Sequence, residues 1–175
     1  MASAGTDVTA VLQHPTSQDL LSNSIARLAY VAPDGTPRVV PIGFLWNGSH
    51  VVMCTSTNAP KVRSLSADPH AALTIDTIEF PPKILLMRGT VELETVDGIP
   101  AEYLAMNSDQ MMVPEQRRAW EVEVRSLYEQ MVRIVMTPTW AKLIDFEGTL
   151  PTAVEELVQE RDERERAHAS TETDD

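Results

Sequence analysis

Two tight-turn signals restrict how the apolar segments in the first third of the chain can be joined. Pro33-Asp34-Gly35 has a proline that presets φ and a glycine that permits positive φ. Asn47-Gly48 is a strong signal for a short hairpin. Each signal lies between two short apolar runs, whereas parallel strands would need a longer crossover connection. The chain is therefore expected to form antiparallel hairpins rather than alternating βαβ units.

The remaining segments extend this pattern to seven strands with helices as inserts. The predicted strands are residues 25–31, 38–46, 50–55, 71–76, 84–94, 131–136 and 140–146. The predicted helices are residues 15–21, 59–67, 99–106 and 115–129. Thr16 or Ser17 is expected near the cap of the first helix. Gly89 predicts a bulge, and Pro41 predicts a strand edge, a bulge or a place where another group approaches.

Several of these strands are apolar on both faces, so both faces are expected to be buried. In a small barrel one face fills the interior, and the other must meet a helix or a second subunit. The expected fold class is therefore mainly β, an antiparallel barrel with a few peripheral helices, assembled as a homodimer.

The length and charge distribution predict one domain with an acidic C-terminal extension. The 175 residues divide into an N-terminal arm with a short helix (1–24), a barrel domain (25–153), and an acidic helix with a disordered tail (154–175). Nine acidic and three basic residues lie between Glu155 and Asp175, half of the formal net charge of -12. The helix is expected to end at Ala167, because the residues beyond it offer nothing to bury.

Composition also argues against several classes of protein. The 14 Lys and Arg residues against 26 Asp and Glu are unfavourable for binding nucleic acid. A single cysteine excludes an intramolecular disulfide framework. No apolar run approaches the ~18 residues of a membrane helix, and the N-terminus lacks a signal-peptide pattern. We therefore expect a cytoplasmic protein without a membrane span.

No self-sufficient catalytic motif is present, so no catalytic residue is predicted. The sequence lacks the zinc-protease helix motif, the nucleophile elbow and the glycine-rich phosphate loops. His14, His50, His70 and His168 do not have the spacing of metal ligands, and no metal site is expected. Cys54 lies in an apolar strand and is expected to be a core residue. If the protein is an enzyme, the chemistry belongs to a bound cofactor.

One segment, residues 55–63, has the features of an anion-binding site. Hydroxyl and amide side chains lead into a helix whose first turn contains Pro60 and then Lys61. The free N–H groups and the positive end of the helix dipole attract an anion. Lys61 adds a mobile charge, and Arg38 on the neighbouring strand adds a bidentate donor. The alternative is an ordinary capped helix with exposed basic residues.

Six short segments occur in an order that is typical of one superfamily. They are residues 28–38 (LAYVAPDGTPR), 43–48 (GFLWNG), 60–65 (PKVRSL), 68–74 (DPHAALT), 88–92 (RGTVE) and 133–138 (RIVMTP). From about Ser24 to Phe146 the chain resembles the FMN-binding split-barrel superfamily, also called pyridoxamine 5′-phosphate oxidase-like. The resemblance implies a split barrel that forms a homodimer with two sites at the interface.

The resemblance also implies where a cofactor lies. An isoalloxazine-type ring rests against the second and third strands, and its phosphate is held at the start of the following helix. Lys61 matches the phosphate-binding lysine, Thr55 the threonine at the strand end, and Arg38 an arginine that helps to hold phosphate. The residues predicted to bind the cofactor are Arg38, Val39, Val40, Pro41, Ile42, Thr55, Ser56 and Lys61.

Two departures from the family pattern weaken the match to FMN. Ala59-Pro60 stands where relatives often have Ser-Arg, and Gly43 stands where the oxidase has a second basic residue. The sequence therefore predicts an oxidoreductase that uses FMN or a deazaflavin to transfer a hydride or electrons to an unidentified small organic molecule. The alternatives are a haem-binding protein for storage or degradation on the same fold, and a non-catalytic member with an empty cleft.

Overall fold

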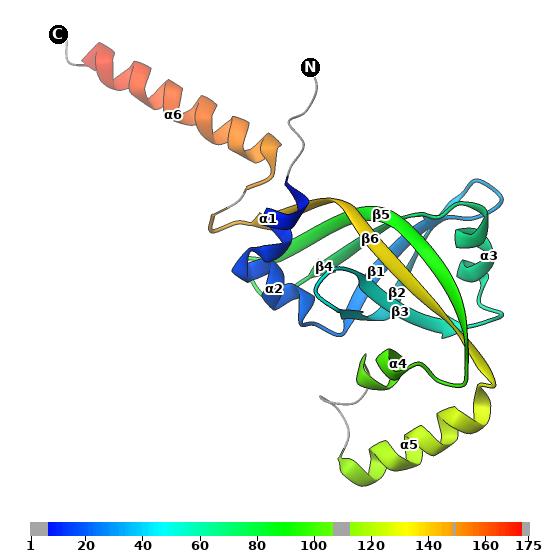
Figure 1. The fold of residues 1–175 in the computed structure, drawn as a ribbon. Coiled ribbons are helices and arrows are strands. Elements are labelled where there is room, and N and C mark those ends of the chain that lie inside the picture. Colours follow the sequence, from blue (N-terminus) through cyan, green and yellow to red (C-terminus); the bar gives the residue numbers. More distant parts are fainter. Residues whose placement is uncertain (1–6, 107–112, 149, 173–175) are drawn as a thin grey trace.

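The computed structural model describes residues 7–106, 113–148 and 150–172, and within them six antiparallel strands close into a barrel. The strands are β1 (Ile25–Val31), β2 (Pro37–Trp46), β3 (Val51–Ser56), β4 (His70–Asp76), β5 (Lys83–Asp97) and β6 (Gln130–Asp145). The helices are α1 (Val8–Gln13), α2 (Pro15–Leu21), α3 (Pro60–Ala67), α4 (Ala101–Met106), α5 (Pro114–Leu127) and α6 (Thr152–Glu172). The order around the barrel is β1-β2-β3-β6-β5-β4 (Figure 1). The predicted mainly β, antiparallel barrel is confirmed.

Both turn signals lie where the sequence places them. Gly35 has a φ of 79° and Gly48 a φ of 97°, which are values that side chains with a Cβ rarely adopt. The Asn47 side chain accepts hydrogen bonds from the N–H groups of Ser49 and His50, at 3.0 and 2.8 Å, and so fixes the β2–β3 turn.

The prediction of two strands after residue 130 is wrong, because β6 is one continuous strand of 16 residues. Pro138 does not end it, since the register of β5 and β6 shifts at Arg88/Gly89, directly opposite. At Gly89 an added Cβ would lie 2.0 Å from the carbonyl oxygen of Thr137. The predicted bulge therefore lies here, with Thr139 of β6 as the extra residue, and Gly89 lets the two long strands pass very close together.

The barrel is closed, but the pairing between β2 and β3 is short. The two strands pair only at Phe44–Met53, Leu45–Val52 and Trp46–Val51, while β1 pairs with β2 from Pro37 to Gly43. The first seven residues of β2 therefore hydrogen-bond to one neighbour only. β3 pairs with β6 along its whole length, from Val51 to Ser56. Pro41, which has no N–H to donate, lies in this half of β2, as expected for a strand edge.

The core fills the barrel with apolar side chains from all six strands and from α1, α2 and α3. α4 packs against β2 and β3, and α1 packs against β6. Tyr103 on α4 stacks on Trp120 of α5 at 6.0 Å between ring centroids, and this ring pair joins the two helices. None of the described helices combines the length and apolar character needed to cross a membrane.

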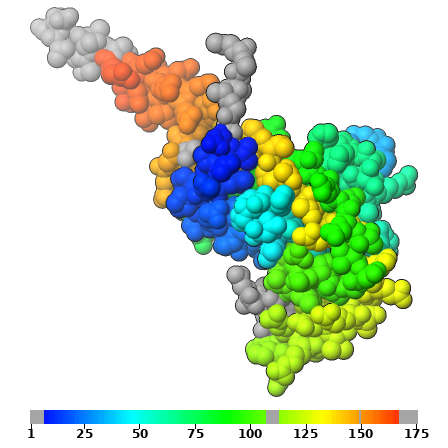
Figure 2. Space-filling model, in the orientation of Figure 1, coloured from blue at the N-terminus to red at the C-terminus, as the bar shows by residue number. Residues whose placement is uncertain are grey.

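The helices differ from expectation mainly at the two ends of the chain. α2 spans the expected residues, but its cap is His14, whose Nδ1 accepts from the N–H of Thr16 at 3.2 Å. α1 was not predicted; Asp7 caps it by accepting from two backbone N–H groups. α6 continues to Glu172 instead of Ala167 and projects away from the barrel (Figure 2). Residues 173–175 of the predicted tail lie outside the described residues.

Candidate functional site

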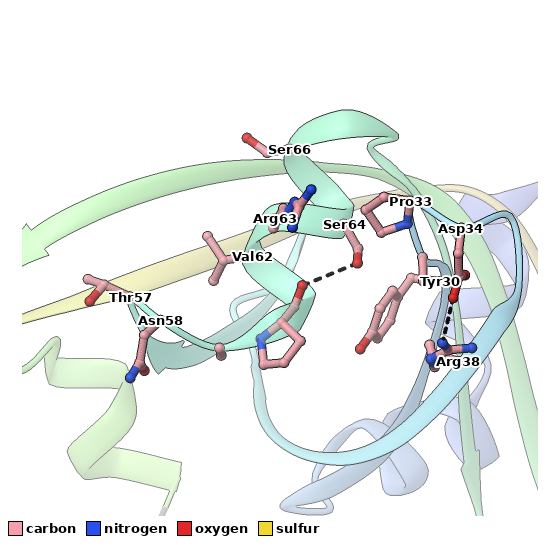
Figure 3. Close-up of a pocket in the computed structure, with 13 residues that line it drawn as sticks. Tyr30, Pro33, Asp34, Arg38, Thr57, Asn58, Val62, Arg63, Ser64 and Ser66 are labelled. Atoms are coloured by element: carbon pink, nitrogen blue, oxygen red, sulfur yellow. Dashed lines mark hydrogen bonds and ion pairs between the residues drawn. The ribbon is translucent and has the colours of Figure 1, made fainter.

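A pocket of about 850 Å³ lies between the β1–β2 hairpin and the start of α3. It occupies the side of the barrel on which β2 and β3 separate. Figure 3 shows its polar side chains on two walls, with Tyr30, Asp34 and Arg38 on the hairpin and Asn58 and Arg63 on the β3–α3 segment. Of the eight residues predicted to bind a cofactor, Arg38 lines this pocket, whereas Val39, Val40, Pro41, Ile42, Thr55, Ser56 and Lys61 do not.

The start of α3 leaves backbone N–H groups without a side-chain cap. Ala59 is the N-cap residue and has no side-chain acceptor, and Pro60 is the first helical residue. Ser64, one turn further, donates its hydroxyl hydrogen to the carbonyl oxygen of Pro60 at 3.2 Å and so does not cap the start. An uncapped helix N-terminus beside two arginines favours the binding of an anion.

Lys61 and Thr55, each predicted to bind the cofactor, lie in contact with one another. The Lys61 ammonium donates a hydrogen bond to the Thr55 hydroxyl at 3.2 Å, and both residues are partly buried. Burial lowers the pKa of Lys61, because no carboxylate compensates its charge there. The lysine side chain is not part of the wall of the 850 Å³ pocket; it lies on the β3 side of the helix start.

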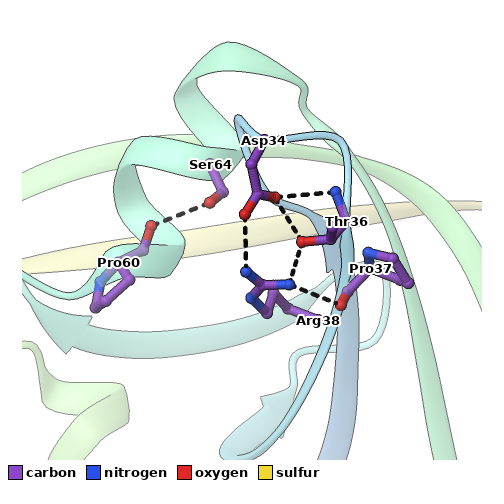
Figure 4. Close-up of polar contacts among 6 residues, drawn as sticks. All are labelled: Asp34, Thr36, Pro37, Arg38, Pro60 and Ser64. Atoms are coloured by element: carbon purple, nitrogen blue, oxygen red, sulfur yellow. Dashed lines mark hydrogen bonds and ion pairs between the residues drawn. The ribbon is translucent and has the colours of Figure 1, made fainter.

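Arg38 lines the pocket but is engaged within its own hairpin. Its Nη2 lies 3.1 Å from Oδ2 of Asp34, and Nη1 donates to Thr36 Oγ1 and to the carbonyl oxygen of Pro37 (Figure 4). Hydrogen bonds from Thr36, followed by the charge of Arg38, lower the pKa of Asp34. Arg38 therefore meets the pocket as one half of an ion pair.

Tyr30 presents an unpaired hydroxyl to the same pocket. Its side chain is 7% exposed and lies between the start of α3 and Arg38 (Figure 3). Within the described residues its hydroxyl has no protein hydrogen-bond partner but stays open to the pocket, since the fully buried side-chain atom that lacks a partner there is Ser17 Oγ. A ligand in the pocket would supply that partner.

The other predicted residues on β2 point in two directions. Val40 packs against the core and Ile42 is buried in it, whereas Val39 is 65% exposed and Pro41 is also exposed. Only Val39 and Pro41 therefore present side chains outside the barrel, where a flat ring can rest. At Gly43, α4 lies above the strand, and an added Cβ would be 3.6 Å from the Met106 sulfur.

A second pocket of about 640 Å³ lies beside the first. Its walls come from Ser56 to Asn58 and from Ser126 to Gln130, including Leu127 and Tyr128. Thr57 and Asn58 line both pockets, so the two cavities flank one turn. Ser56, predicted to bind the cofactor, belongs to this second pocket.

Cys54, His14 and His70 line neither of these two pockets. Burial, followed by the charge of Glu102, raises the pKa of Cys54 to about 12, so its thiol is protonated at neutral pH. His14 caps α2 and His70 pairs with Asp68. Among the described residues, no group of three or more metal-binding side chains exists.

Sequence reasoning did not identify Tyr30, Asp34 or Arg63 as site residues. In the sequence Tyr30 occupies an inward position of a strand and is typical of a core residue. Asp34 is typical of an ordinary turn residue. The i, i+4 spacing of Asp34 and Arg38 across the turn was the available signal, but its meaning depends on the hairpin geometry.

Comparison with known proteins agrees with this architecture. The family model described as pyridoxamine 5′-phosphate oxidase matches residues 14–131. The solved structure of an F420 reductase is 29% identical, covers 71% of this chain and 94% of its own, and gives a TM-score of 0.55. No curated protein matches the sequence.

Two further solved structures share the fold at lower identity. The haem storage protein HutZ from Vibrio cholerae is 16% identical over 74% of this chain and 92% of its own, with a TM-score of 0.54. A conserved hypothetical protein from Mycobacterium tuberculosis is 14% identical over 83% of this chain and 85% of its own, with a TM-score of 0.56.

Proposed function

Because this chain belongs to the pyridoxamine 5′-phosphate oxidase family, we propose that it is a flavin- or deazaflavin-dependent oxidoreductase. The observation that carries the proposal is the pocket between the β1–β2 hairpin and α3, which adjoins the unpaired half of β2. When bound, the ring of such a cofactor supplies hydride or electron transfer to a small organic substrate.

In this proposal the residues of the chain bind and orient the cofactor. The α3 N-terminus, Arg38 and Arg63 attract its anionic group, and Tyr30 donates a hydrogen bond to it. Lys61, held by Thr55, adds a cation at the same helix start. Val39 and Pro41 support one face of the ring by apolar contact.

The β3–α3 segment favours a deazaflavin over FMN. Ala59 and Pro60 offer neither a hydroxyl nor a guanidinium, so the set of side-chain donors around a phosphomonoester is incomplete. A solved F420 reductase shares this fold at 29% identity, and F420 is a deazaflavin. A ligand held mainly through its ring loses less from these substitutions.

Haem is the second candidate, because a site that lacks side-chain donors for the FMN phosphate is also consistent with a protein that no longer binds FMN. The residues lining the 850 Å³ pocket include no histidine, cysteine or methionine that could act as an axial ligand. The pocket therefore fits a flavin or deazaflavin better than haem.

Retention of a coloured ligand tests the proposal. Purified protein is mixed with FMN, a deazaflavin coenzyme or haemin, freed of unbound ligand by gel filtration, and examined by visible absorption. We expect retention of the deazaflavin and bleaching of its band when a reductant is supplied anaerobically. Stoichiometric retention of haemin alone would favour the haem-binding alternative, and retention of none of the three would indicate a non-catalytic member.

A further inference from the structure

Helix α4 covers the outer face of β3 and ends beside β2. Val52 and Cys54 of β3 do not belong to the core cluster inside the barrel, yet they are only 0% and 8% exposed. α4 packs against both β2 and β3 (Figure 1). An ion pair at 2.8 Å between Glu102 of α4 and Arg133 of β6 fastens the helix across this face. α4 therefore forms a wall at one end of the exposed half of β2.

Met106, the last residue of α4, fills the space outside Gly43. A Cβ added at Gly43 would lie 3.6 Å from the Met106 sulfur and 4.0 Å from the Met106 Cβ, which are ordinary van der Waals distances. Gly43 lies on the same face of β2 as the exposed Val39 and Pro41, because side chains alternate along a strand and Ile42 between them is buried. The outer face of β2 is thus open at Val39 and Pro41 and bounded by Met106.

A flat ring that rests on Pro41 reaches this sulfur. Residues two apart on one face of a strand are separated by about 6.6 Å, and the tricyclic ring of a flavin or deazaflavin is longer than that. From this arrangement we propose that Met106 is a ring-contact residue, whose thioether touches the edge of the bound ring and stops it from sliding along β2 toward α4. A polarizable thioether is well suited to contact with an aromatic edge.

The inference rests on the proposed function for the presence of the ring, whereas the packing of Met106 on Gly43 does not. The first arm of the test therefore measures the packing in the full chain without a ligand. Gly43→Leu should lower the Tm, because the larger side chain meets Met106. Adding Met106→Ala to Gly43→Leu should recover most of this loss, as a double-mutant cycle shows directly.

Leu104→Ala is the matched control on the same helix. Leu104 lies two residues before Met106 in α4, so its side chain leaves the helix on a different face. This substitution should not recover the loss caused by Gly43→Leu. Equal recovery by Leu104→Ala and Met106→Ala would overturn the assignment of Met106, because the space outside Gly43 would then depend on the helix as a whole.

The second arm measures the ring contact with riboflavin, which has the ring and no phosphate, and with a deazaflavin coenzyme. Met106→Ala should weaken the binding of riboflavin about fivefold, within the range of sulfur–aromatic contacts. Met106→Leu keeps the apolar volume and should weaken it less, and Leu104→Ala should leave it unchanged. Iodide should quench the fluorescence of bound riboflavin more in Met106→Ala than in the native chain, because one ring edge becomes accessible to solvent.

Failure of the inference and failure of the proposed function give different results. A ring that binds equally to the native chain, Met106→Ala and Leu104→Ala, with equal quenching by iodide, would overturn the ring contact and leave the proposed function standing. A native chain that binds neither riboflavin nor the deazaflavin coenzyme would contradict the proposed function and the ring contact with it, even where the first arm shows that Met106 packs on Gly43.

Discussion

Lys61 is held by a threonine hydroxyl instead of a carboxylate, so its charge is available to a ligand. Its ammonium is partly desolvated, which lowers its pKa, and an anion nearby would stabilise the charged form. A site for the phosphate of a cofactor is the simplest reason to keep a lysine in this position.

Replacing Lys61 by alanine should weaken the binding of FMN by about 1.5–3 kcal/mol, the range for a charge-assisted hydrogen bond. Riboflavin, which has no phosphate, should be affected much less. In the native chain the affinity for FMN should fall as the pH rises through the lowered pKa of Lys61, because the ammonium is then lost. Calorimetric titrations of both ligands at several pH values measure these differences.

Lys142→Ala is the matched control, since Lys142 also donates to a threonine, Thr152, at 3.1 Å. It should leave the affinities for both ligands unchanged. Equal losses of FMN and riboflavin in Lys61→Ala would mean that the lysine acts through the fold, and no loss of either would remove it from the site.

Gly89 is needed for the closest approach of two strands. A Cβ there would lie 2.0 Å from a backbone oxygen of β6, and neither strand can move without breaking its ladder. Gly89→Ala should reduce the free energy of unfolding by about 3 kcal/mol or more. Gly148→Ala should change the free energy of unfolding little, because a Cβ added at Gly148 would meet no atom within 4 Å. Denaturant unfolding compares the two variants, and similar values for both would refute this account of the bulge.

At the scale of the elements, strands were predicted well where turn chemistry brackets them. Both early hairpins and the Gly89 bulge follow from local residue properties. The single long β6 could not be foreseen, because Pro138 is tolerated only through a register shift on the opposing strand. α1 was missed because its six residues are stabilised by packing on β6 and by the Asp7 cap rather than by propensity.

The same division applies to the site. The sequence identifies Lys61 and Thr55 as separate candidates around one strand end, whereas their hydrogen bond is seen only in the structure. The pairing of Arg38 with Asp34 depends on the backbone geometry of the hairpin turn, which could not be predicted from the identities of the two residues.

α6 contributes little to the stability of the barrel. Among the described residues α6 is joined to β6 by the hydrogen bond from Lys142 to Thr152, and its charged side chains pair along the helix, as Arg161 does with Glu165 at 3.9 Å. Ending the chain after Val158 should therefore leave the Tm almost unchanged. A fall of more than about 5 °C in calorimetry would show that the helix docks on the domain.

At the scale of the whole molecule, the outer face of the β1–β2 hairpin is apolar and exposed. Val39 lies opposite Ala29 in the ladder, Ile25 is 60% exposed and Val31 44% exposed. This face adjoins the unpaired half of β2, so a second subunit there would cover the face and border the pocket. We expect a homodimer with an interface above about 2,000 Å².

Val39→Asp should dissociate this dimer in sedimentation velocity experiments at micromolar concentration. Ile78→Asp is the control, because Ile78 is 98% exposed on the β4–β5 loop and should not affect assembly. A native chain that sediments as a monomer would show that the apolar face has another role.

We propose that the pocket beside α3 holds the anionic group of a flavin-type cofactor. It offers too few hydrogen-bond donors to a phosphate for tight FMN binding. Calorimetric titration of the purified protein with FMN and with a deazaflavin coenzyme tests it directly. We expect an FMN dissociation constant no tighter than micromolar, about -8 kcal/mol, and tighter binding of the deazaflavin. Nanomolar FMN affinity, or a protein that purifies yellow with stoichiometric FMN, would contradict it.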